Sequence, residues 1–232
     1  MKTSKLILIT FVITVLIIGL FDFIVAPKLP NTVQVGYFKA ATNSEQILAV
    51  GVTKDSEAFA ALYIKEGDKK WHQVLTDRCI IAKNGLGRKL EDDGKTPKGL
   101  FKITQAFGLA KDPGAMMKYT QIDNTYYWVG DTQSPLYNTL VSTKKVDYFD
   151  QPRSINFTSS KGAFEYAFSF NYNPYNIPNM GAGAFIQCMQ SLDQKYTNGN
   201  IAFDHKTMVK LLKLVHDNCV IIIDDIGNLT NY

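Results

Sequence analysis

Little in this sequence points to a metal centre, a disulfide framework or a nucleic-acid partner. Its 232 residues include only three cysteines and three histidines, with no Cys-x-x-Cys step and no Cys/His cluster of metal-ligand spacing. Cys79, Cys188 and Cys219 each lie in or beside an apolar run, so we expect buried thiols with at most one disulfide among them. The net charge of +4 is small and spread along the chain, too weak a signal for nucleic acid. No metal or other cofactor is predicted.

The composition is that of a folded protein. Apolar residues make up 46% of the chain and charged residues 20%, which suits one hydrophobic core of ordinary size plus an appendage and gives no sign of long disorder. The slight excess of basic residues could favour an anionic polymer of the cell envelope. An ordinary solvated surface explains that excess more simply.

The clearest signal lies at the N-terminus. Two lysines precede an uncharged apolar run from 6 to 21, a pattern typical of a secretory signal peptide or an uncleaved signal anchor. Pro27 follows Ala26 directly and no small-residue cleavage site is obvious, which favours the anchor. We therefore predict a transmembrane or signal helix over 1–26. It would hold the rest of the chain outside the cytoplasmic membrane, or release it as a secreted protein if the segment is cleaved.

The remaining chain reads as a tether, a domain and a tail. Residues 27–44 contain prolines and polar residues and predict a tether, the folded domain is expected over 45–226, and 227–232 form a tail. Asp204 is a good N-cap for an amphipathic helix over 206–217. Short runs rich in β-branched residues predict strands at 46–52, 60–65, 71–75, 100–103, 184–186, 201–203 and 219–223. The fold class is therefore mainly β with one C-terminal helix.

The stretch from 181 to 203 has the layout of a catalytic site. A glycine-flanked apolar run at 184–186 predicts a short buried strand that ends in the polar Gln187. A polar loop follows, and the turn at 197–200 leads into a second buried strand. Gly199 permits a backbone conformation closed to other residues, so the amides that follow can point at a developing oxyanion.

This pattern resembles the catalytic domain of the L,D-transpeptidase family (YkuD-type), whose signature is a strand ending in His, a spacer, and then Ser/Thr-x-Gly-Cys. Gln187 stands where the family has its His, and Asn200 stands where the family has its nucleophilic Cys. Thr197 and Gly199 keep the family pattern. The sequence Asp-Gly-Lys-Thr-Pro-Lys-Gly at 93–99 also resembles a recurrent, mainly architectural element of the family.

The resemblance runs from about 46 to 223 and carries expectations about fold and substrate. It implies a mixed two-sheet β-sandwich of the L,D-transpeptidase type. It also implies acyl transfer on peptidoglycan stem peptides, in which a thiolate attacks a donor carbonyl, D-Ala leaves and an amine accepts the acyl group. Thr197, Asn198 and Gly199 would then form part of the substrate-binding turn.

The two substitutions remove the groups that this chemistry needs. A carboxamide supplies neither an accessible anion for attack nor a group that titrates near neutral pH, so Asn200 and Gln187 cannot act as nucleophile and base. The sequence therefore predicts a catalytically degenerate, envelope-anchored domain that binds peptidoglycan or its stem peptides. The two amides could still bond to each other or to a bound peptide.

Two alternatives stay open at this level. Cys188, with His205 as its base, could form a displaced nucleophile site in an active L,D-transpeptidase or carboxypeptidase. Neighbours on a strand point to opposite faces, so Cys188 faces away if Gln187 faces the site, unless a one-residue bulge intervenes. The domain could also serve another partner with no cell-wall role. The sequence leaves the oligomeric state undetermined.

Overall fold

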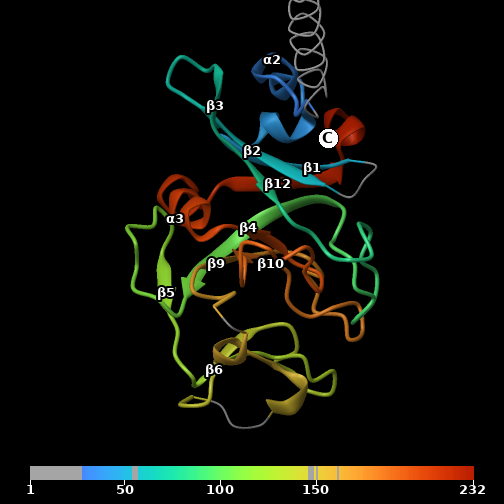
Figure 1. The fold of residues 1–232 in the computed structure, drawn as a ribbon, viewed down its shortest axis with the longest axis vertical. Helices are drawn as coiled ribbons and strands as arrows, with labels where there is room; N and C mark the ends of the chain where they lie inside the picture. The colour runs from blue at the N-terminus through green and yellow to red at the C-terminus, as the bar shows by residue number, and fades with distance from the viewer. Residues whose placement is uncertain (1–27, 54–56, 146–148, 150, 161) are drawn as a thin grey trace, which may run out of the picture.

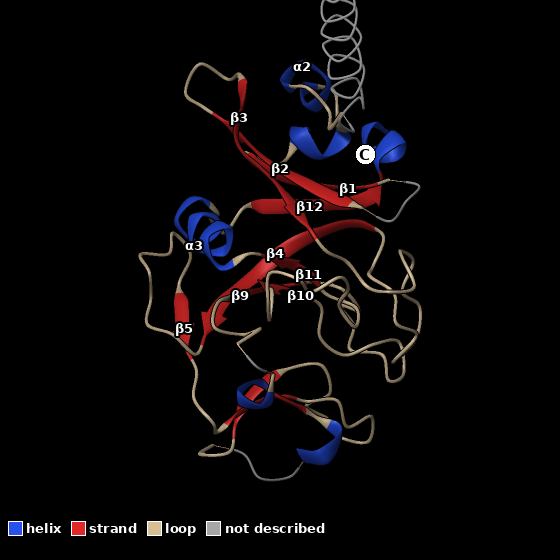
Figure 2. Cartoon of the chain, in the orientation of Figure 1, coloured by secondary structure: helices blue, strands red, loops and turns tan. Residues whose placement is uncertain are grey.

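The computed structural model describes residues 28–53, 57–145, 149, 151–160 and 162–232. The predicted signal segment at 1–26 lies outside these ranges. Within them, none of the helices combines the length and the apolar character that a membrane span requires. Strands dominate the described chain, as the sequence predicts (Figure 2).

A nine-stranded mixed sheet forms the body of the described chain. Its strand order is β11-β10-β9-β4-β12-β1-β2-β3, with β5 paired to β4 off this path. The pairs β1–β12, β10–β11 and β4–β5 are parallel, and the others are antiparallel. The strands are β1 (Gln46–Val52), β2 (Ala58–Lys65), β3 (Trp71–Cys79), β4 (Gly99–Gly108), β5 (Tyr119–Gln121), β9 (Ala167–Phe170), β10 (Phe185–Cys188), β11 (Ile201–Phe203) and β12 (Cys219–Asp225).

The two ends of this sheet nearly meet. Directly after β3, Ile80 forms an antiparallel bridge with Ala202 of β11, with a main-chain hydrogen bond of 2.9 Å in each direction. The predicted mainly β class with mixed strand directions is confirmed. The packing differs from a plain two-layer sandwich, because one sheet curls until its edges approach each other and encloses a core of its own.

A second, small sheet lies at the end of the molecule opposite the C-terminus (Figure 1). It contains β6 (Tyr126–Trp128), β7 (Leu140–Ser142) and β8 (Ile155–Asn156), in the order β7-β6-β8. Short 3₁₀ helices at Gln151–Arg153 and Phe157–Ser159 flank β8. Trp128 packs edge-on against Phe185 of β10, with ring centroids 5.0 Å apart, and thereby joins this sheet to the main sheet. Within β6, Trp128 is buried and the two tyrosines before it are partly buried.

The predicted C-terminal helix is α3 (His205–Leu214), which ends three residues earlier than expected. Asp204 caps it by accepting a hydrogen bond from the Thr207 main-chain nitrogen at 3.1 Å. Its apolar stripe at Met208, Leu211 and Leu212 is fully buried against the sheet. Capping and periodicity were therefore sufficient to find this element.

The segments placed in a tether and a tail are packed onto the domain in their described parts. α2 (Thr32–Gly36) and a 3₁₀ helix (Lys39–Thr42) bury Val35 and Phe38 against the outer face of β1, β2 and β12. The last residues form a 3₁₀ helix (Ile226–Asn231) that buries Leu229 in the same cluster. The strands that they cover are apolar on both faces. Without these two segments, the outer apolar face of the strands would be exposed to water. Both segments lie beside β1 in Figure 1.

Candidate functional site

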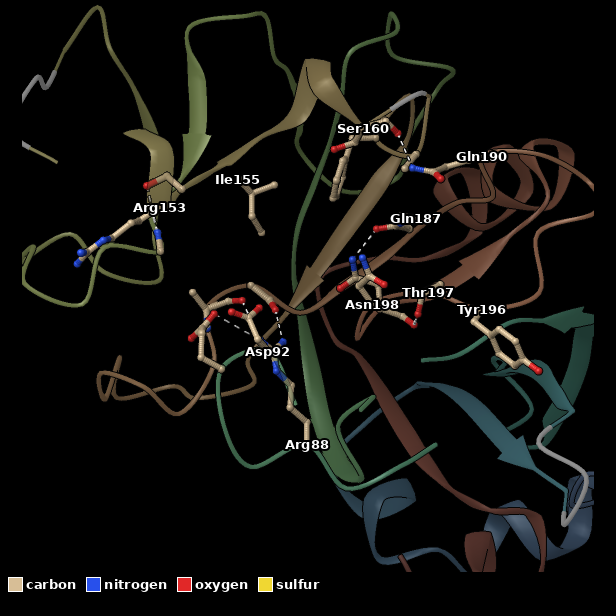
Figure 3. A pocket seen from close by; sticks show the side chains of 18 of the residues that line it. Arg88, Asp92, Arg153, Ile155, Ser160, Gln187, Gln190, Tyr196, Thr197 and Asn198 are labelled. Atoms are coloured by element: carbon tan, nitrogen blue, oxygen red, sulfur yellow. Dashed lines mark hydrogen bonds and ion pairs between the residues drawn. The ribbon is translucent and has the colours of Figure 1, made fainter. Parts of the chain in front are cut away.

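A polar cleft of about 710 Å³ lies between the main sheet and the small sheet. The stretch 182–200 forms one wall, the loop after β3 contributes Arg88, Glu91 and Asp92, and residues 152–155 come from the small-sheet side (Figure 3). Of the predicted site residues, Gln187, Thr197, Asn198 and Asn200 line the cleft. The topology thus brings the two substituted positions, Gln187 and Asn200, together at one opening.

Gln187 and Asn200 are directly hydrogen-bonded. The Nδ2 of Asn200 donates to Oε1 of Gln187 at 2.6 Å, and the Oδ1 of Asn200 accepts from the Phe185 main-chain nitrogen at 3.2 Å. Gln187 lies on β10, which pairs in parallel with β11, and Asn200 immediately precedes β11. The two strands therefore hold the carboxamides together.

The turn before β11 has the form that the sequence predicts. Gly199 has a φ of +136°, in the region that favours glycine. The hydroxyl of Thr197 donates to the Asn200 main-chain oxygen at 2.5 Å, and the Gly199 nitrogen donates back to that hydroxyl at 3.4 Å. The Thr197 hydroxyl is therefore engaged within the turn, and Gly199 is buried beneath it. Asn198 is exposed at the cleft.

The 93–99 element reaches the site through one residue. Thr96 is fully buried, and its hydroxyl accepts from the Ala82 main-chain nitrogen at 3.0 Å and donates to the Asn200 main-chain oxygen at 3.3 Å. Asp93 closes the preceding turn by accepting hydrogen bonds from the main-chain nitrogens of Lys89 and Lys95. The element thus acts as a support for the turn that carries Asn200.

Cys188 points away from the cleft. Its side chain is 1% exposed, it belongs to the core enclosed by the curled sheet, and its thiol donates to the Tyr166 main-chain oxygen at 3.6 Å. Burial raises the pKa of this thiol to about 11. No bulge interrupts the pairing of β10 with β9 or β11, so the alternation of side chains along the strand holds. All three cysteines are buried free thiols.

His205 is not part of the cleft wall. It opens α3, its ring lies 5.2 Å from that of Tyr166, and its Nε2 is 3.3 Å from Oε1 of Glu165. The side chain is about half exposed. Among the described residues, no hydrogen bond connects His205, or either of the other histidines, to Cys188. The proposed Cys188–His205 pair is therefore absent in this arrangement.

An arginine that the sequence does not single out organises the opposite wall. Arg88 is 9% exposed and donates to the main-chain oxygens of Gly183 at 2.6 Å and Ala182 at 3.2 Å. Glu91, 3.7 Å from the guanidinium, accepts hydrogen bonds from the Ala182 nitrogen and from the Tyr137 hydroxyl at 2.8 Å. This network ties the glycine-rich entry of β10 to the loop after β3.

Sequence reasoning missed Arg88 and Glu91 because nothing local marks them. Arg88 lies 95 residues before the Gly183 oxygen that it binds, and it is one of 25 basic residues. Only the curled sheet brings the two segments together. The sequence also did not predict that residues 152–155 line the cleft. They lie in a region with weak hydrophobic periodicity, where the strands β7 and β8 are short.

The arrangement suits binding better than acyl transfer. No Cys or His lines the cleft in the described chain. The side chains present offer carboxamides, hydroxyls, two arginines and two acids, which are groups that recognise peptide or sugar by hydrogen bonding. The carboxylate of Glu91 already accepts hydrogen bonds from the Ala182 nitrogen and the Tyr137 hydroxyl and is paired with Arg88.

Comparisons with known proteins give only distant likenesses. No protein-family model matches the chain, and no curated protein matches its sequence. Among solved structures, Bd1075 of Bdellovibrio bacteriovorus is 13% identical, with a TM-score of 0.41, covering 81% of this chain and 50% of that one. The helical cell shape determining protein Pgp2 of Campylobacter jejuni is 14% identical, with a TM-score of 0.42, covering 83% of this chain and 54% of that one. The chain thus spans about half the length of each, and its function has to be argued from the site.

Proposed function

We propose that this chain is an L,D-transpeptidase-like domain that has lost its catalytic pair and binds peptidoglycan or its stem peptides. The observation that carries the proposal is the 2.6 Å hydrogen bond between Asn200 and Gln187 at the two positions where the resembled family keeps thiol and imidazole. The supporting scaffold, including the Gly199 turn and the Thr96 brace, is retained around it. The cleft therefore keeps a shape suited to a peptide while the reacting groups are replaced.

Replacing the nucleophile and the base is expected to lower the rate of acyl transfer by a large factor. Removing the nucleophile from a catalytic triad costs about six orders of magnitude in rate in the best-studied serine protease series. An amide nitrogen cannot recover this, because its lone pair is delocalised and does not ionise near neutral pH. Binding, by contrast, needs only placed donors and acceptors, and the cleft keeps these.

The runner-up is an active L,D-transpeptidase or carboxypeptidase that uses Cys188. It requires β10 to shift by one residue or to open, so that the buried thiol exchanges places with Gln187. Such a shift would bury the polar Gln187 in the apolar core. A third possibility is a partner unrelated to the cell wall.

We further propose that the domain works outside the cytoplasm, held at the cytoplasmic membrane by residues 1–26. The support is the uncharged apolar run after two lysines in the sequence. Two exposed apolar side chains lie a few residues after that segment: Val33 in α2 is 67% exposed, and Tyr37, directly after α2, is 85% exposed.

The binding proposal is tested by co-sedimentation of the full-length protein with purified peptidoglycan sacculi. Retention in the pellet, released by soluble stem peptide or glycan fragments, is the expected result. The matched control is sedimentation of the same protein with an insoluble cellulose of similar particle size. Failure to sediment with sacculi would favour the partner unrelated to the cell wall.

A further inference from the structure

The orientation of the two carboxamides in the cleft is fixed by one main-chain group. The Phe185 nitrogen is an obligatory donor, so the Asn200 atom facing it at 3.2 Å has to be Oδ1. The Asn200 Nδ2 is then directed at Gln187, whose facing atom has to be Oε1. It follows that the Gln187 Nε2 points away from Asn200.

That nitrogen has no hydrogen-bond partner among the residues that the structure describes. Gln187 is 6% exposed and lines the cleft, and within the described chain its Nε2 donates no hydrogen bond. The nitrogen is not sealed in the core either, since only His72 Nε2 is both fully covered and unpartnered among the described side chains. A carboxamide held almost entirely inside the protein thus has its oxygen bonded to Asn200, and the two N–H donors of its Nε2 remain available to the cleft that Gln187 lines.

We infer that Gln187 Nε2 is a binding point for an amide carbonyl oxygen of the ligand. An N–H group is satisfied only by a hydrogen-bond acceptor, so this point of the cleft favours an acceptor over a donor. The charges on the cleft wall balance, with Arg88 and Arg153 against Glu91 and Asp92, which favours a neutral acceptor over a carboxylate. Peptide bonds and the acetamido groups of amino sugars both carry that oxygen.

This inference rests on the proposed function, because it names the group of a peptidoglycan-type ligand that the cleft recognises. It also makes a specific demand on Asn200. In Asn200→Asp, the atom facing Gln187 becomes a second carboxylate oxygen, while the first still accepts from Phe185. Gln187 must then turn over to donate to it, and its Oε1 faces the cleft instead. Gln187→Glu likewise puts an oxygen in that place.

The test follows the Gln187 side-chain NH₂ signals of the full-length protein by NMR, assigned by their loss in Gln187→Glu. Two neutral probes distinguish the sources of the oxygen: N-acetyl-alanyl-alanine amide for a peptide and tetra-N-acetylchitotetraose for a glycan. We expect one of them to shift the Gln187 signals. We also expect Asn200→Asp and Gln187→Glu each to weaken its binding about tenfold or more, since an acceptor would then face an acceptor.

The matched control is Asn218→Asp, which makes the same change of an asparagine to an aspartate on an exposed residue that does not line the cleft and leaves the Gln187–Asn200 pair intact. It should change binding less than about threefold, within the range of an exposed charge. Main-chain amide spectra that match the wild type outside the site show that each variant is folded. If one of the two site variants does not fold, the other is sufficient for the test.

Two results would overturn the inference. One is that neither probe moves the Gln187 signals, and the other is that Asn200→Asp binds the probes as tightly as the wild type. If the wild type still sediments with sacculi in either case, binding uses other groups and the proposed function stands. If the wild type fails to sediment with sacculi, the proposed function itself fails.

Discussion

The thiol of Cys188 and the main-chain oxygen of Tyr166 lie 3.6 Å apart inside the apolar core, while Gln187, one residue earlier, faces the polar cleft. Adjacent residues of β10 therefore serve opposite sides of the sheet. This relationship separates the one cysteine near the site from any substrate in the cleft.

The first prediction is that carbapenem-type β-lactams leave the protein unmodified. Burial raises the Cys188 pKa to about 11, so the thiolate fraction at pH 7 is on the order of 10⁻⁴, and the thiol does not line the cleft. Intact-mass spectrometry after incubation should show no adduct. Cys188→Ala is the control, and an adduct on the wild type that disappears in this variant would establish a displaced nucleophile.

The second prediction concerns restoration of the family's pair. The double substitution Gln187→His with Asn200→Cys places an imidazole and a thiol on side chains that are 2.6 Å apart in the present protein. An imidazole beside a thiol lowers the thiol pKa, so alkylation at neutral pH should be about tenfold faster than that of an ordinary exposed thiol.

The reference for that rate is Asn198→Cys, an exposed cysteine two residues away in the same turn. Rates are read with iodoacetamide and then with a β-lactam, in folded protein, so that the buried native thiols do not contribute. Equal rates for the two variants would mean that the strand register or the assignment of these positions to the family's pair is wrong.

The third prediction is that Arg88 stabilises the domain through the wall of the cleft. Arg88→Ala removes the donors to the Gly183 and Ala182 oxygens and the ion-pair partner of Glu91. Losing hydrogen bonds from a buried charged group costs about 1.5–3 kcal/mol. Urea denaturation measures it as a fall in the unfolding free energy.

Arg78→Ala is the matched control for that change. Arg78 is 68% exposed and lies 3.4 Å from Glu57, and an exposed pair contributes about 0–1 kcal/mol. A loss for Arg88→Ala no larger than that for Arg78→Ala would contradict the role assigned to the network.

The fourth prediction is a pH dependence centred on Asp224. Burial alone would raise the pKa of this carboxyl, but hydrogen bonds from Lys98 at 2.6 Å and Tyr232 at 2.7 Å outweigh it and hold the pKa below its ordinary value. A folded-state pKa below the unfolded one stabilises the protein above about pH 4. That contribution is lost as the pH falls from there through the folded-state pKa.

Asp224→Asn should therefore be less stable than the wild type at pH 7, and its stability should fall less between pH 5 and pH 2. The comparison is with Asp225→Asn, because Asp225 also contacts Lys98 but is 59% exposed. Thermal unfolding followed by circular dichroism at a series of pH values gives the dependence of stability on pH for each variant. Parallel pH curves for Asp224→Asn and the wild type would refute the assignment.

The elements that the sequence predicts well are those with a local signal. β1, β10, β11 and β12 are continuous apolar runs, and α3 has both a cap and a period. The turn at Gly199 was equally readable, because a glycine between polar residues before a strand has few other uses. The opposite orientation of Gln187 and Cys188 followed from strand alternation alone.

What escaped the sequence depends on long-range contacts. The bridge between Ile80 and Ala202 curls the sheet, and no local pattern encodes a contact between residues that lie 122 positions apart. Residues 27–44 read as a tether because they contain two prolines and several polar residues, yet their described part covers an apolar sheet face. Arg88 binds groups far along the chain, so its place in the cleft had no sequence signal.

The most direct measurement of the central claim combines binding with turnover on one sample. Full-length protein is incubated with soluble peptidoglycan fragments that carry tetrapeptide stems, and bound fragment and free D-alanine are both measured by mass spectrometry. The account predicts fragment recovered with the protein and no D-alanine above the protein-free control. D-alanine release that is abolished by Cys188→Ala would contradict it.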